Sequence, residues 1–441
     1  MKIPERPKPY RESLPKALSW SAETNKEVLE LVKRYNEGYV HWDELRRKVL
    51  PTDPETVWAL MKLTRESQCR HVKFHEVLLS FNMTSEAHRI VHMLDTGASG
   101  LMMVEEPLSK QEMDRYIVSS LMEEAIASSQ IEGAVTTTKD AKRMLRENRK
   151  PRSQSERMIL NDYLTMQRIK EIKDQPLTVE IILELHRSIT NGTLEDASSE
   201  GRFRTDDEVV VADPFELDKV YHRPPSFVKL QTYMEDLCKF ANNEDDVSFQ
   251  HPLVKSIILH FMIGYVHPFV DGNGRLARAL MYWYGLKRNY WLFEYMAISK
   301  VIKESKGKYG LAYLHAETDD NDVTYFINYN LDCMEKALKN TRDYIARKQG
   351  EQRESLKLIS SHPELNFRQA EILKDLIKRK GEPVSIMEIA SKFSVVHQTA
   401  RSDLLFLVEH GLLDKMKVGK RLLFRYAPKE NGSAPQAGPS E

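Results

Sequence analysis

Apolar residues recur three and four positions apart along most of the chain, and short polar breaks separate these segments. This spacing places apolar side chains on one face of a helix, so the pattern predicts a mainly α-helical fold. The first hundred residues are expected to form helices with short breaks. The segment 110–133 is a long predicted helix that ends at Gly133. Its apolar stripe consists of Tyr116, Ile117, Leu121, Met122, Ala125 and Ile126.

Two strongly apolar segments, 253–266 and 279–286, enclose a polar stretch that begins with His267 and Pro268. Because proline lacks the backbone N–H that continues a helix, the first helix is predicted to end near His267. The second helix is predicted to begin near Asn273. The stretch is therefore expected to be a polar loop held between two buried helices.

This polar stretch contains the residues of an anion site. Gly272 and Gly274 allow backbone conformations and close approach that side chains would forbid. A helix that begins near Asn273 directs its first N–H groups and the positive end of its dipole into the loop. Arg275 and Arg278 are three residues apart and project from the same side of that helix. Two guanidinium groups beside exposed amides suit a polyphosphate.

Two further side chains add chemistry to the stretch. Asp271 is a hard oxygen donor, which suits a magnesium ion that bridges phosphates. His267 is the side chain there that exchanges a proton near neutral pH, so it is the candidate base. Each feature alone has a plainer interpretation: a structural histidine, a glycine turn, a solvated arginine face or a His–Asp metal pair. Their joint occurrence favours a phosphate site.

The stretch resembles the signature of the Fic (Fic/Doc, Fido) family, which is His-Pro-Phe-x-Asp/Glu-Gly-Asn-Gly/Lys-Arg followed by a second arginine. Residues His267 to Arg275 match it without departure, and Arg278 stands where the second arginine belongs. The resemblance covers about residues 110–344 and implies the Fic/Fido helical core. It also implies AMP transfer from ATP to a Ser, Thr or Tyr hydroxyl of a target protein, the enzyme itself included, with release of pyrophosphate and with Mg²⁺ as cofactor.

The same resemblance implies a role for each residue. His267 would deprotonate the target hydroxyl, and Asp271 would hold magnesium on the α- and β-phosphates. Arg275 would bind the β- and γ-phosphates, and Arg278 the γ-phosphate. The anion hole would be lined by Gly272, Asn273 and Gly274.

An inhibitory motif is indicated near the end of the predicted helix 110–133. Ser128 and Glu132 are four residues apart and share a helix face, and Gly133 follows. This spacing alone is commonplace, but beside the signature it resembles the family's inhibitory Ser/Thr-x-x-x-Glu-Gly/Asn. The implied mechanism is that Glu132 pairs with Arg278, because a guanidinium occupied by a carboxylate cannot also grip a phosphate.

The segments 208–211 and 220–225 are predicted to form a short β-hairpin. The first is β-branched, and the second is extended by its prolines. The hairpin resembles the family's flap, which lies over the active site and aligns the target by backbone pairing. A plain surface hairpin is the alternative. The flap residues singled out are Tyr221, Pro224 and Pro225.

Helices predicted at 370–379, 385–393 and 398–410, followed by a basic hairpin around Gly419, resemble a winged helix-turn-helix. Contact with DNA through 397–425 is one interpretation, and a protein-binding or dimerisation module, including a homodimer, is the other. The residues expected to face a major groove are His397, Gln398, Arg401 and Ser402. Those expected to meet phosphates are Lys415, Lys417, Lys420 and Arg421.

Charge and cysteine content narrow the function classes. The 65 basic and 65 acidic residues cancel, so no global field favours nucleic acid or membrane. The longest apolar run, 256–266, is too short to span a bilayer. His88 and His92 have a metal-binding spacing but no arranged partner. With three scattered cysteines and no apolar leader segment, we expect a cytoplasmic protein without a disulfide framework or zinc site.

The predicted organisation is an N-terminal helical region (1–109), a Fic domain (110–345) that includes the inhibitory helix 110–133, a winged helix-turn-helix (355–427) and a disordered tail (428–441). The charged segment 345–363 is expected to be a connector. Two alternatives remain open. One is a Fic enzyme that uses another nucleotide donor or removes AMP, and the other is a nucleotide-sensing regulator that binds DNA.

Overall fold

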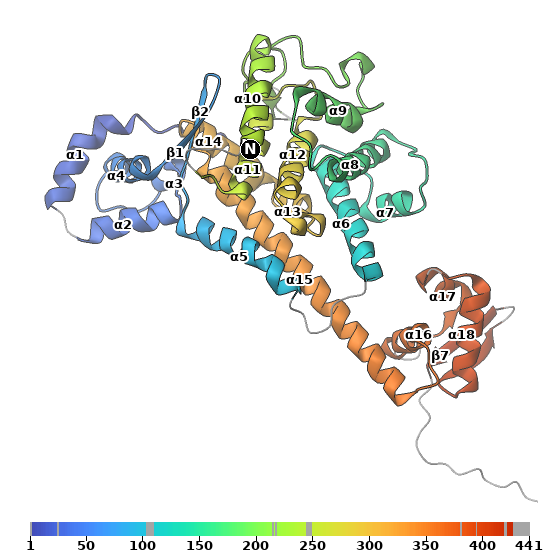
Figure 1. The fold of residues 1–441 in the computed structure, drawn as a ribbon. Helices are drawn as coiled ribbons and strands as arrows, with labels where there is room; N and C mark the ends of the chain where they lie inside the picture. Colours follow the sequence, from blue (N-terminus) through green and yellow to red (C-terminus); the bar gives the residue numbers. More distant parts are fainter. Residues whose placement is uncertain are drawn as a thin grey trace, which may run out of the picture. The chain divides into compact units, whose positions relative to one another are not determined.

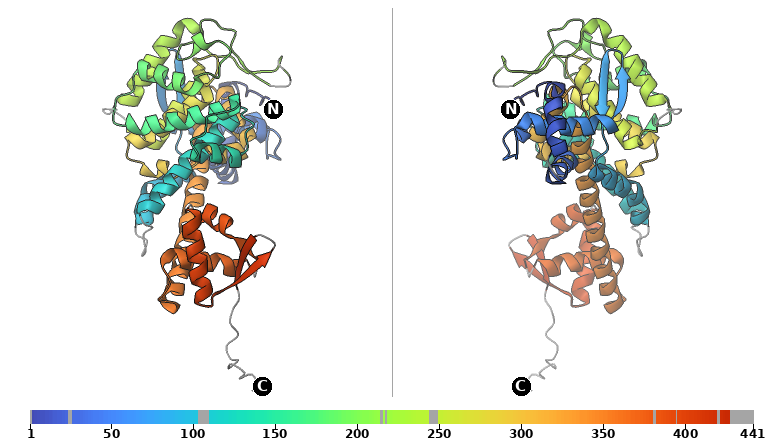
Figure 2. Two further views of the ribbon diagram at one scale, coloured as in Figure 1. Left: turned by 90° about the vertical axis from the view of Figure 1, so that its right-hand side faces the viewer. Right: turned by 90° about the vertical axis from the view of Figure 1, so that its left-hand side faces the viewer.

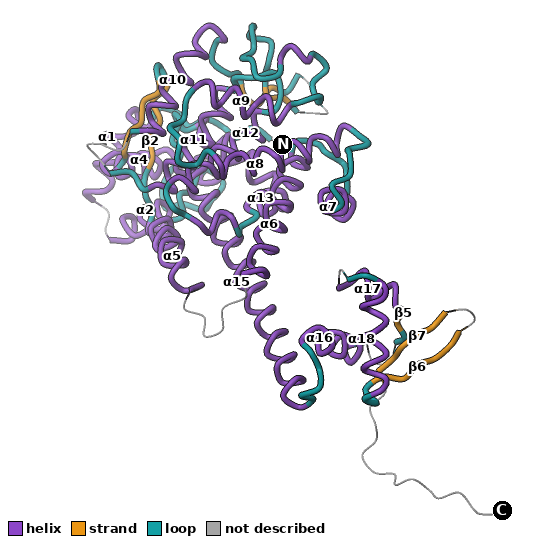
Figure 3. Tube along the Cα trace, turned by 45° about the vertical axis from the view of Figure 1, so that its right-hand side comes forward, coloured by secondary structure: helices purple, strands orange, loops and turns teal. Residues whose placement is uncertain are grey.

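A computed structural model of the chain describes residues 2–23, 26–102, 110–213, 216, 218–243, 249–379, 382–393, 395–418 and 421–426. Helices make up most of this described part (Figures 1 and 3). The chain divides into two compact units, residues 1–105 with 109–342, and residues 106–108 with 343–441. The expected tail 428–441 lies outside the described residues, as do Gly419 and Lys420.

The core of the first unit is the helix pair α11 (Pro252–Val266) and α12 (Asn273–Lys287). Nearly every residue of both helices is buried, because α11 is apolar on all sides and a helix of that kind needs cover all round. The polar loop 267–272 joins them. The predicted end of the first helix and start of the second are both confirmed.

Further helices enclose this pair, and α6 packs against both α8 and α13. Their bounds are α5 (Ser85–Met102), α6 (Lys110–Ile131), α7 (Thr138–Arg146), α8 (Gln154–Glu171), α9 (Val179–Thr190), α10 (Leu230–Asn242), α13 (Ile298–Glu304), α14 (Lys306–Thr318) and α15 (Thr324–Ser361).

The N-terminal region contains four helices, α1 (Tyr10–Glu23), α2 (Lys26–Glu37), α3 (Trp42–Leu45) and α4 (Pro54–Gln68). The expectation of helices alone was wrong, because an antiparallel hairpin, β1 (Arg70–Phe74) and β2 (Val77–Phe81), follows them. Its burial alternates with the period of two that defines a strand. Ser80 also pairs with the backbone at Asp322, and the hairpin lies beside α10 (Figure 2).

The predicted flap hairpin is present as β3 (Val211–Ala212) and β4 (Val220–His222), which pair antiparallel. The first strand begins later than the β-branched run 208–211 suggested. Within that run, Val211 is the residue that pairs with β4. The prolines, Pro224 and Pro225, come after β4 and Arg223, in the segment that leads to α10.

The second unit contains α16 (Phe367–Lys378), α17 (Ile386–Phe393), α18 (His397–Glu409) and a three-stranded sheet. The strands β5 (Val384–Ser385), β6 (Leu413–Val418) and β7 (Arg421–Tyr426) lie in the order β5-β7-β6. This is the predicted winged helix-turn-helix arrangement. The connector expected at 345–363 is instead a continuation of α15 to Ser361, since its Lys, Arg, Glu and Gln residues are good helix formers.

Among the described residues, no helix is both long and apolar enough to cross a membrane.

Candidate active site

His267 stands where α11 ends, in a left-handed conformation with φ 47° and ψ 59°. Its backbone N–H still bonds to Ile263 O, while Nδ1 lies 3.3 Å from Gly264 O. A carbonyl accepts only, so Nδ1 carries the proton and Nε2 keeps its lone pair. Burial lowers the pKa of His267 below its ordinary value, although the bond to Gly264 opposes this shift. The neutral form of the imidazole is therefore favoured.

The side chain of Asn273 closes the loop on itself. Its Oδ1 accepts the N–H of Phe269 at 3.0 Å, and its Nδ2 donates to the carbonyl of Phe269 at 2.8 Å. Phe269 is fully buried, whereas the next residue, Val270, is 43% exposed. The Asn273 amide thus holds the loop shape, and only its backbone is available to line an anion site.

His186 on α9 packs against the loop. The sequence patterns did not predict this residue. Its ring stacks on Phe269 with centroids 3.6 Å apart. Nδ1 accepts the N–H of Gly201 at 3.0 Å, so Nε2 is the protonated nitrogen, which donates to Asp271 O at 2.8 Å. Burial lowers the pKa of His186 to about 4, so it remains a neutral support.

Arg204 is a second residue that sequence reasoning missed. Its guanidinium is buried and donates to the carbonyl of His267 (3.1 Å), to the Asp207 carboxylate (2.8 Å) and to the carbonyl of Pro225. Its own N–H bonds to Pro268 O at 3.0 Å. One side chain therefore joins the loop to the stem of the flap. No local signal marks it, since most of its partners are carbonyls distant in sequence.

Both arginines of α12 are buried, Arg275 completely and Arg278 at 1% exposure. The interpretation of a solvated arginine face is therefore wrong. Arg275 Nη1 donates to Ile189 O at 3.0 Å, while its Nε and Nη2 have no hydrogen-bond partner within the described chain. Unpaired buried guanidinium donors are costly unless a ligand uses them, which favours an anion site here.

Arg278 faces the C-terminal end of α6. Its Nε donates to Ser128 Oγ at 3.0 Å, and its Nη2 donates to Ser128 O and to Glu132 Oε1, both at 2.9 Å. Burial alone would raise the pKa of Glu132, but the charges of Arg278 and Arg275 outweigh it and hold that pKa below its usual value. Glu132 is therefore an anion at neutral pH.

The Glu132 carboxylate lies on the first turn of α12. A Cβ placed on Gly274 would overlap Glu132 Oε1 and lie 2.8 Å from its carboxyl carbon. Gly272, the N-cap, has a φ of 83°, and a Cβ there would lie 2.9 Å from Thr190. The two glycines thus expose the helix start to an anion, and a protein carboxylate lies beside it. Gly133, with φ 101°, turns the chain away after Glu132.

Helix α6 is held in this position by buried and charged partners. Glu124 accepts bonds from Tyr282 Oη (2.7 Å) and the N–H of Ser299 (2.8 Å), and burial raises its pKa to about 7. Lys306 on α14 donates to Ile131 O, at the helix end. Asp162 on α8 accepts from Ser129, and burial raises its pKa to about 6. These contacts fix the segment that presents Glu132.

Asp271 combines an engaged and an exposed carboxylate oxygen. Oδ1 accepts the N–H of Gly272 at 2.6 Å, and Oδ2 is 3.7 Å from Arg275 Nη2. The side chain is 58% exposed at the mouth of the loop. An exposed carboxylate next to an anion site fits a magnesium ion, which typically takes one or two carboxylates and completes its shell with phosphates and water.

The three residues predicted to belong to a flap have different surroundings. Tyr221 Oη donates to Asp213 across the hairpin, and Pro225 accepts from Arg204. Pro224 and Pro225 are half-buried. The flap stem is thus bonded to the segment that carries His267.

Comparison with known proteins agrees with this geometry. The sequence model of the Fic/DOC family matches residues 176–285, which contain the complete signature loop. Residues 176–285 of the chain are therefore similar to the Fic/DOC family. A second match, to the DeoR-like helix-turn-helix domain, covers residues 368–423.

Curated relatives of this chain include the protein adenylyltransferase Fic of Drosophila ananassae, 28% identical over 169 residues, and that of Drosophila melanogaster, 29% identical over 164 residues. These alignments cover 38% and 37% of this chain but only 30% and 29% of the relatives' own length. Among solved structures, Fic-1 from C. elegans has a TM-score of 0.51 at 15% identity, covering 78% of this chain and 90% of that one. That likeness shows a shared fold.

Proposed function

We propose that this Fic protein transfers AMP from ATP to a hydroxyl side chain of a target protein and is held inactive by Glu132. The observation that carries the proposal is the Glu132 carboxylate, 2.9 Å from the buried Arg278 and against the first turn of α12. The helix start, the two glycines and the two arginines together favour an anion at this position, and the Glu132 carboxylate is such an anion. The names of the curated relatives support the reaction class.

In the proposed reaction, His267 Nε2 takes the proton of the target hydroxyl as its oxygen attacks the α-phosphorus of ATP. The new O–P bond forms as the bond between the α-phosphorus and the bridging oxygen breaks, and pyrophosphate leaves. Nδ1–H remains on Gly264 O and holds the ring in the tautomer that accepts this proton. Positioning and charge stabilisation provide most of the rate in such transfers.

The remaining loop residues are proposed to bind the triphosphate. The Nε and Nη2 of Arg275, which have no hydrogen-bond partner among the described residues, are assigned to the β- and γ-phosphates, and Arg278 to the γ-phosphate once Glu132 releases it. The backbone of Gly272, Asn273 and Gly274 would line the anion hole. Asp271 would hold Mg²⁺, which when bound neutralises charge on the phosphates.

The test compares two labels of ATP in the Glu132→Gly protein with Mg²⁺ and cell lysate. Label on the α-phosphate is expected to become protein-bound, because AMP is transferred, and label on the γ-phosphate is not. Mass spectrometry of the labelled bands would then identify the target and the modified residue. γ-Label that becomes protein-bound through this enzyme would contradict the proposal. If ATP leaves no label but another labelled nucleotide does, that nucleotide is the donor instead.

A second activity, DNA binding, is proposed for the C-terminal unit. His397, Gln398, Arg401 and Ser402 are all exposed on the first turns of α18. Lys415 and Lys417 are exposed on β6. A helix face of this kind flanked by a basic hairpin suits a major groove and its phosphates.

For this second activity we expect Lys415→Glu in the full chain to weaken binding to a fluorescent DNA duplex about tenfold or more at low salt. The slope of the logarithm of the binding constant against the logarithm of the salt concentration should become shallower by about one, because a phosphate contact is lost. Lys339→Glu, an equal charge reversal on exposed α15 surface, is the matched control. Equal weakening by both variants, or no binding by the parent, would favour a protein-binding module.

A further inference from the structure

His222, the last residue of flap strand β4, has a ring that bridges two other elements. The residue is 9% exposed. Its Nε2 lies 2.6 Å from the carbonyl oxygen of Tyr265 on α11, and its Nδ1 lies 2.7 Å from Oε2 of Glu317 on α14. Tyr265 is two residues before His267. The ring therefore connects the flap to the backbone that leads into the signature loop.

The two acceptors define the number of protons in this bridge. A carbonyl only accepts, so Nε2 must carry a proton. A carboxylate also only accepts, so a second proton must lie between Nδ1 and Glu317. Whichever of the two atoms holds it, the pair has one proton more than a neutral imidazole beside a carboxylate. Charge-assisted bonds of this type are the strong ones.

The groups around His222 are few. Glu317 is the carboxylate in contact with the ring, and it is itself 16% exposed. On α11, the Tyr265 ring lies 5.0 Å away between centroids, and His267 is close enough for a charge on His222 to lower its pKa. From the N-terminal arm, Arg6 donates to the backbone carbonyl of Glu317 at 3.2 Å rather than to its carboxylate.

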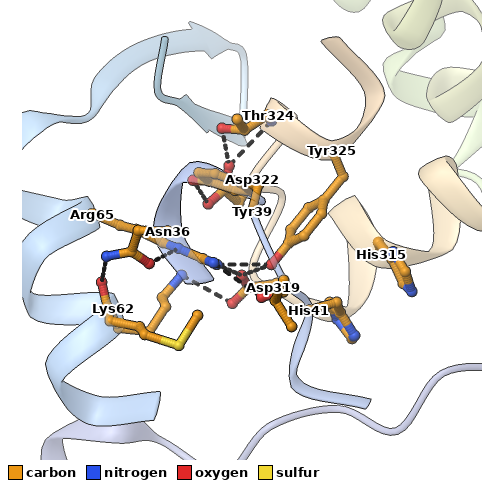
Figure 4. Close-up of polar contacts among 12 residues, drawn as sticks. Asn36, Tyr39, His41, Lys62, Arg65, His315, Asp319, Asp322, Thr324 and Tyr325 are labelled. Carbon is orange, nitrogen blue, oxygen red and sulfur yellow. Dashed lines mark hydrogen bonds and ion pairs between the residues drawn. The ribbon is translucent and has the colours of Figure 1, made fainter. Parts of the chain in front are cut away.

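A buried charge network lies around Asp319, directly after the end of α14 (Figure 4). Asp319, two residues after Glu317, accepts from Lys62 Nζ at 2.9 Å and lies 3.8 Å from Arg65 Nη1. Both cations come from α4, and all three side chains are buried or nearly so. Such an environment does not move readily, so the flap is attached to a rigid support.

We propose that His222 is a positioning residue: with the second proton it clamps β4 between Tyr265 and Glu317 and so fixes the flap relative to His267. Without the bonds to Tyr265 and Glu317, the end of β4 would lose its attachment to α11 and α14, and the flap would loosen. The catalytic consequence rests on the AMP transfer proposed above. The effect on the order of the flap does not depend on that proposed activity.

Hydrogen exchange tests the clamp without requiring activity. Amide exchange of residues 218–226 is measured in the full chain and corrected for intrinsic rates. His222→Gln cannot reach both acceptors and should exchange about tenfold or more faster than the parent, which corresponds to the loss of one charge-assisted hydrogen bond. His88→Gln, at an exposed histidine on α5, is the matched control and should exchange as the parent does.

Glu317→Gln is the informative partner variant. Its carboxamide can still bond to Nδ1 but carries no charge, so the bond is no longer charge-assisted, and protection should lie between that of the parent and that of His222→Gln. Exchange equal to the parent's in Glu317→Gln would overturn the proposal, as would unchanged exchange in His222→Gln. If His222→Gln fails to fold, as seen by circular dichroism, the Glu317→Gln comparison still decides.

The catalytic arm uses the Glu132→Gly background. His222→Gln should lower kcat for labelling about tenfold and leave KM for ATP unchanged, because the flap touches the target and not the triphosphate. Glu317→Gln should lower kcat less than His222→Gln does. A rise in KM for ATP with kcat unchanged would contradict the positioning role. Absence of any label in the background protein would contradict the proposed function instead, with the exchange result unaffected.

Discussion

His267→Ala, made in the Glu132→Gly background, is expected to lower protein-bound AMP by about 10²- to 10⁴-fold. General-base catalysis contributes about that much to a rate. The imidazole is the group lost, while the backbone contacts of His267 to Ile263 and Arg204 remain. ATP affinity should therefore stay close to that of the background protein. Label from α-labelled ATP and nucleotide binding by calorimetry together measure the effect.

The matched control is His88→Ala, because His88 is an exposed histidine on α5, outside the site. It should leave labelling unchanged. Persistent label in His267→Ala would remove the base assignment. Loss of ATP binding together with label would show that the substitution had disturbed the loop rather than the proton transfer.

The pH dependence of AMP labelling follows from His267. Burial lowers the pKa of His267, so its proton-accepting form is populated from below the ordinary histidine range upward, and the rate rises through that pKa. The rate of labelling by the Glu132→Gly protein, measured against pH, should therefore already have reached its plateau at neutral pH. A rate that still rises above the ordinary histidine range would contradict the assignment of His267 as the base.

The loop between α11 and α12 was predictable from sequence because local chemistry sets it. Pro268 and the glycines leave few backbone options, and α12 begins at Asn273 as expected. The hairpin at 70–81 was missed for the opposite reason. Its strands have five residues each, and one of them also pairs with the backbone near Asp322, more than two hundred residues away. Propensity in so short a segment is weaker than tertiary pairing.

Supporting residues of the site were likewise not predictable. Arg204, His186 and His222 act mainly on backbone carbonyls, and a carbonyl partner leaves no residue-type signal in the sequence. Asn273 shows a related limit. Its place in the signature suggests a lining residue, whereas its side chain is used to close the loop on Phe269. Residue type identifies the chemistry of the loop, and only the fold shows which atoms remain for the ligand.

Glu132→Gly is expected to raise AMP labelling by about 10- to 100-fold. The substitution removes a charge-assisted hydrogen bond to Arg278, and a bond of that kind is worth about 1.5–3 kcal/mol. It also clears the carboxylate from the first turn of α12, while Ser128 continues to hold the Arg278 side chain. The freed Nη2 is then available to the γ-phosphate.

A double-mutant cycle separates this explanation from a general loosening of α6. Adding Arg278→Ala to Glu132→Gly should cancel most of the gain, since the two residues are proposed to act through one contact. Glu123→Gln, which removes a carboxylate from the same helix that faces Lys142 and Lys300 instead, should leave labelling at the parent level. Labelling by Glu132→Gln should lie between that of the parent and that of the glycine variant, because a neutral amide still accepts a hydrogen bond from Arg278 but competes weakly with phosphate.

Equal labelling in Glu132→Gly and the parent would rule out inhibition by this carboxylate. A gain in labelling that survives Arg278→Ala would instead place the restraint in the packing of α6.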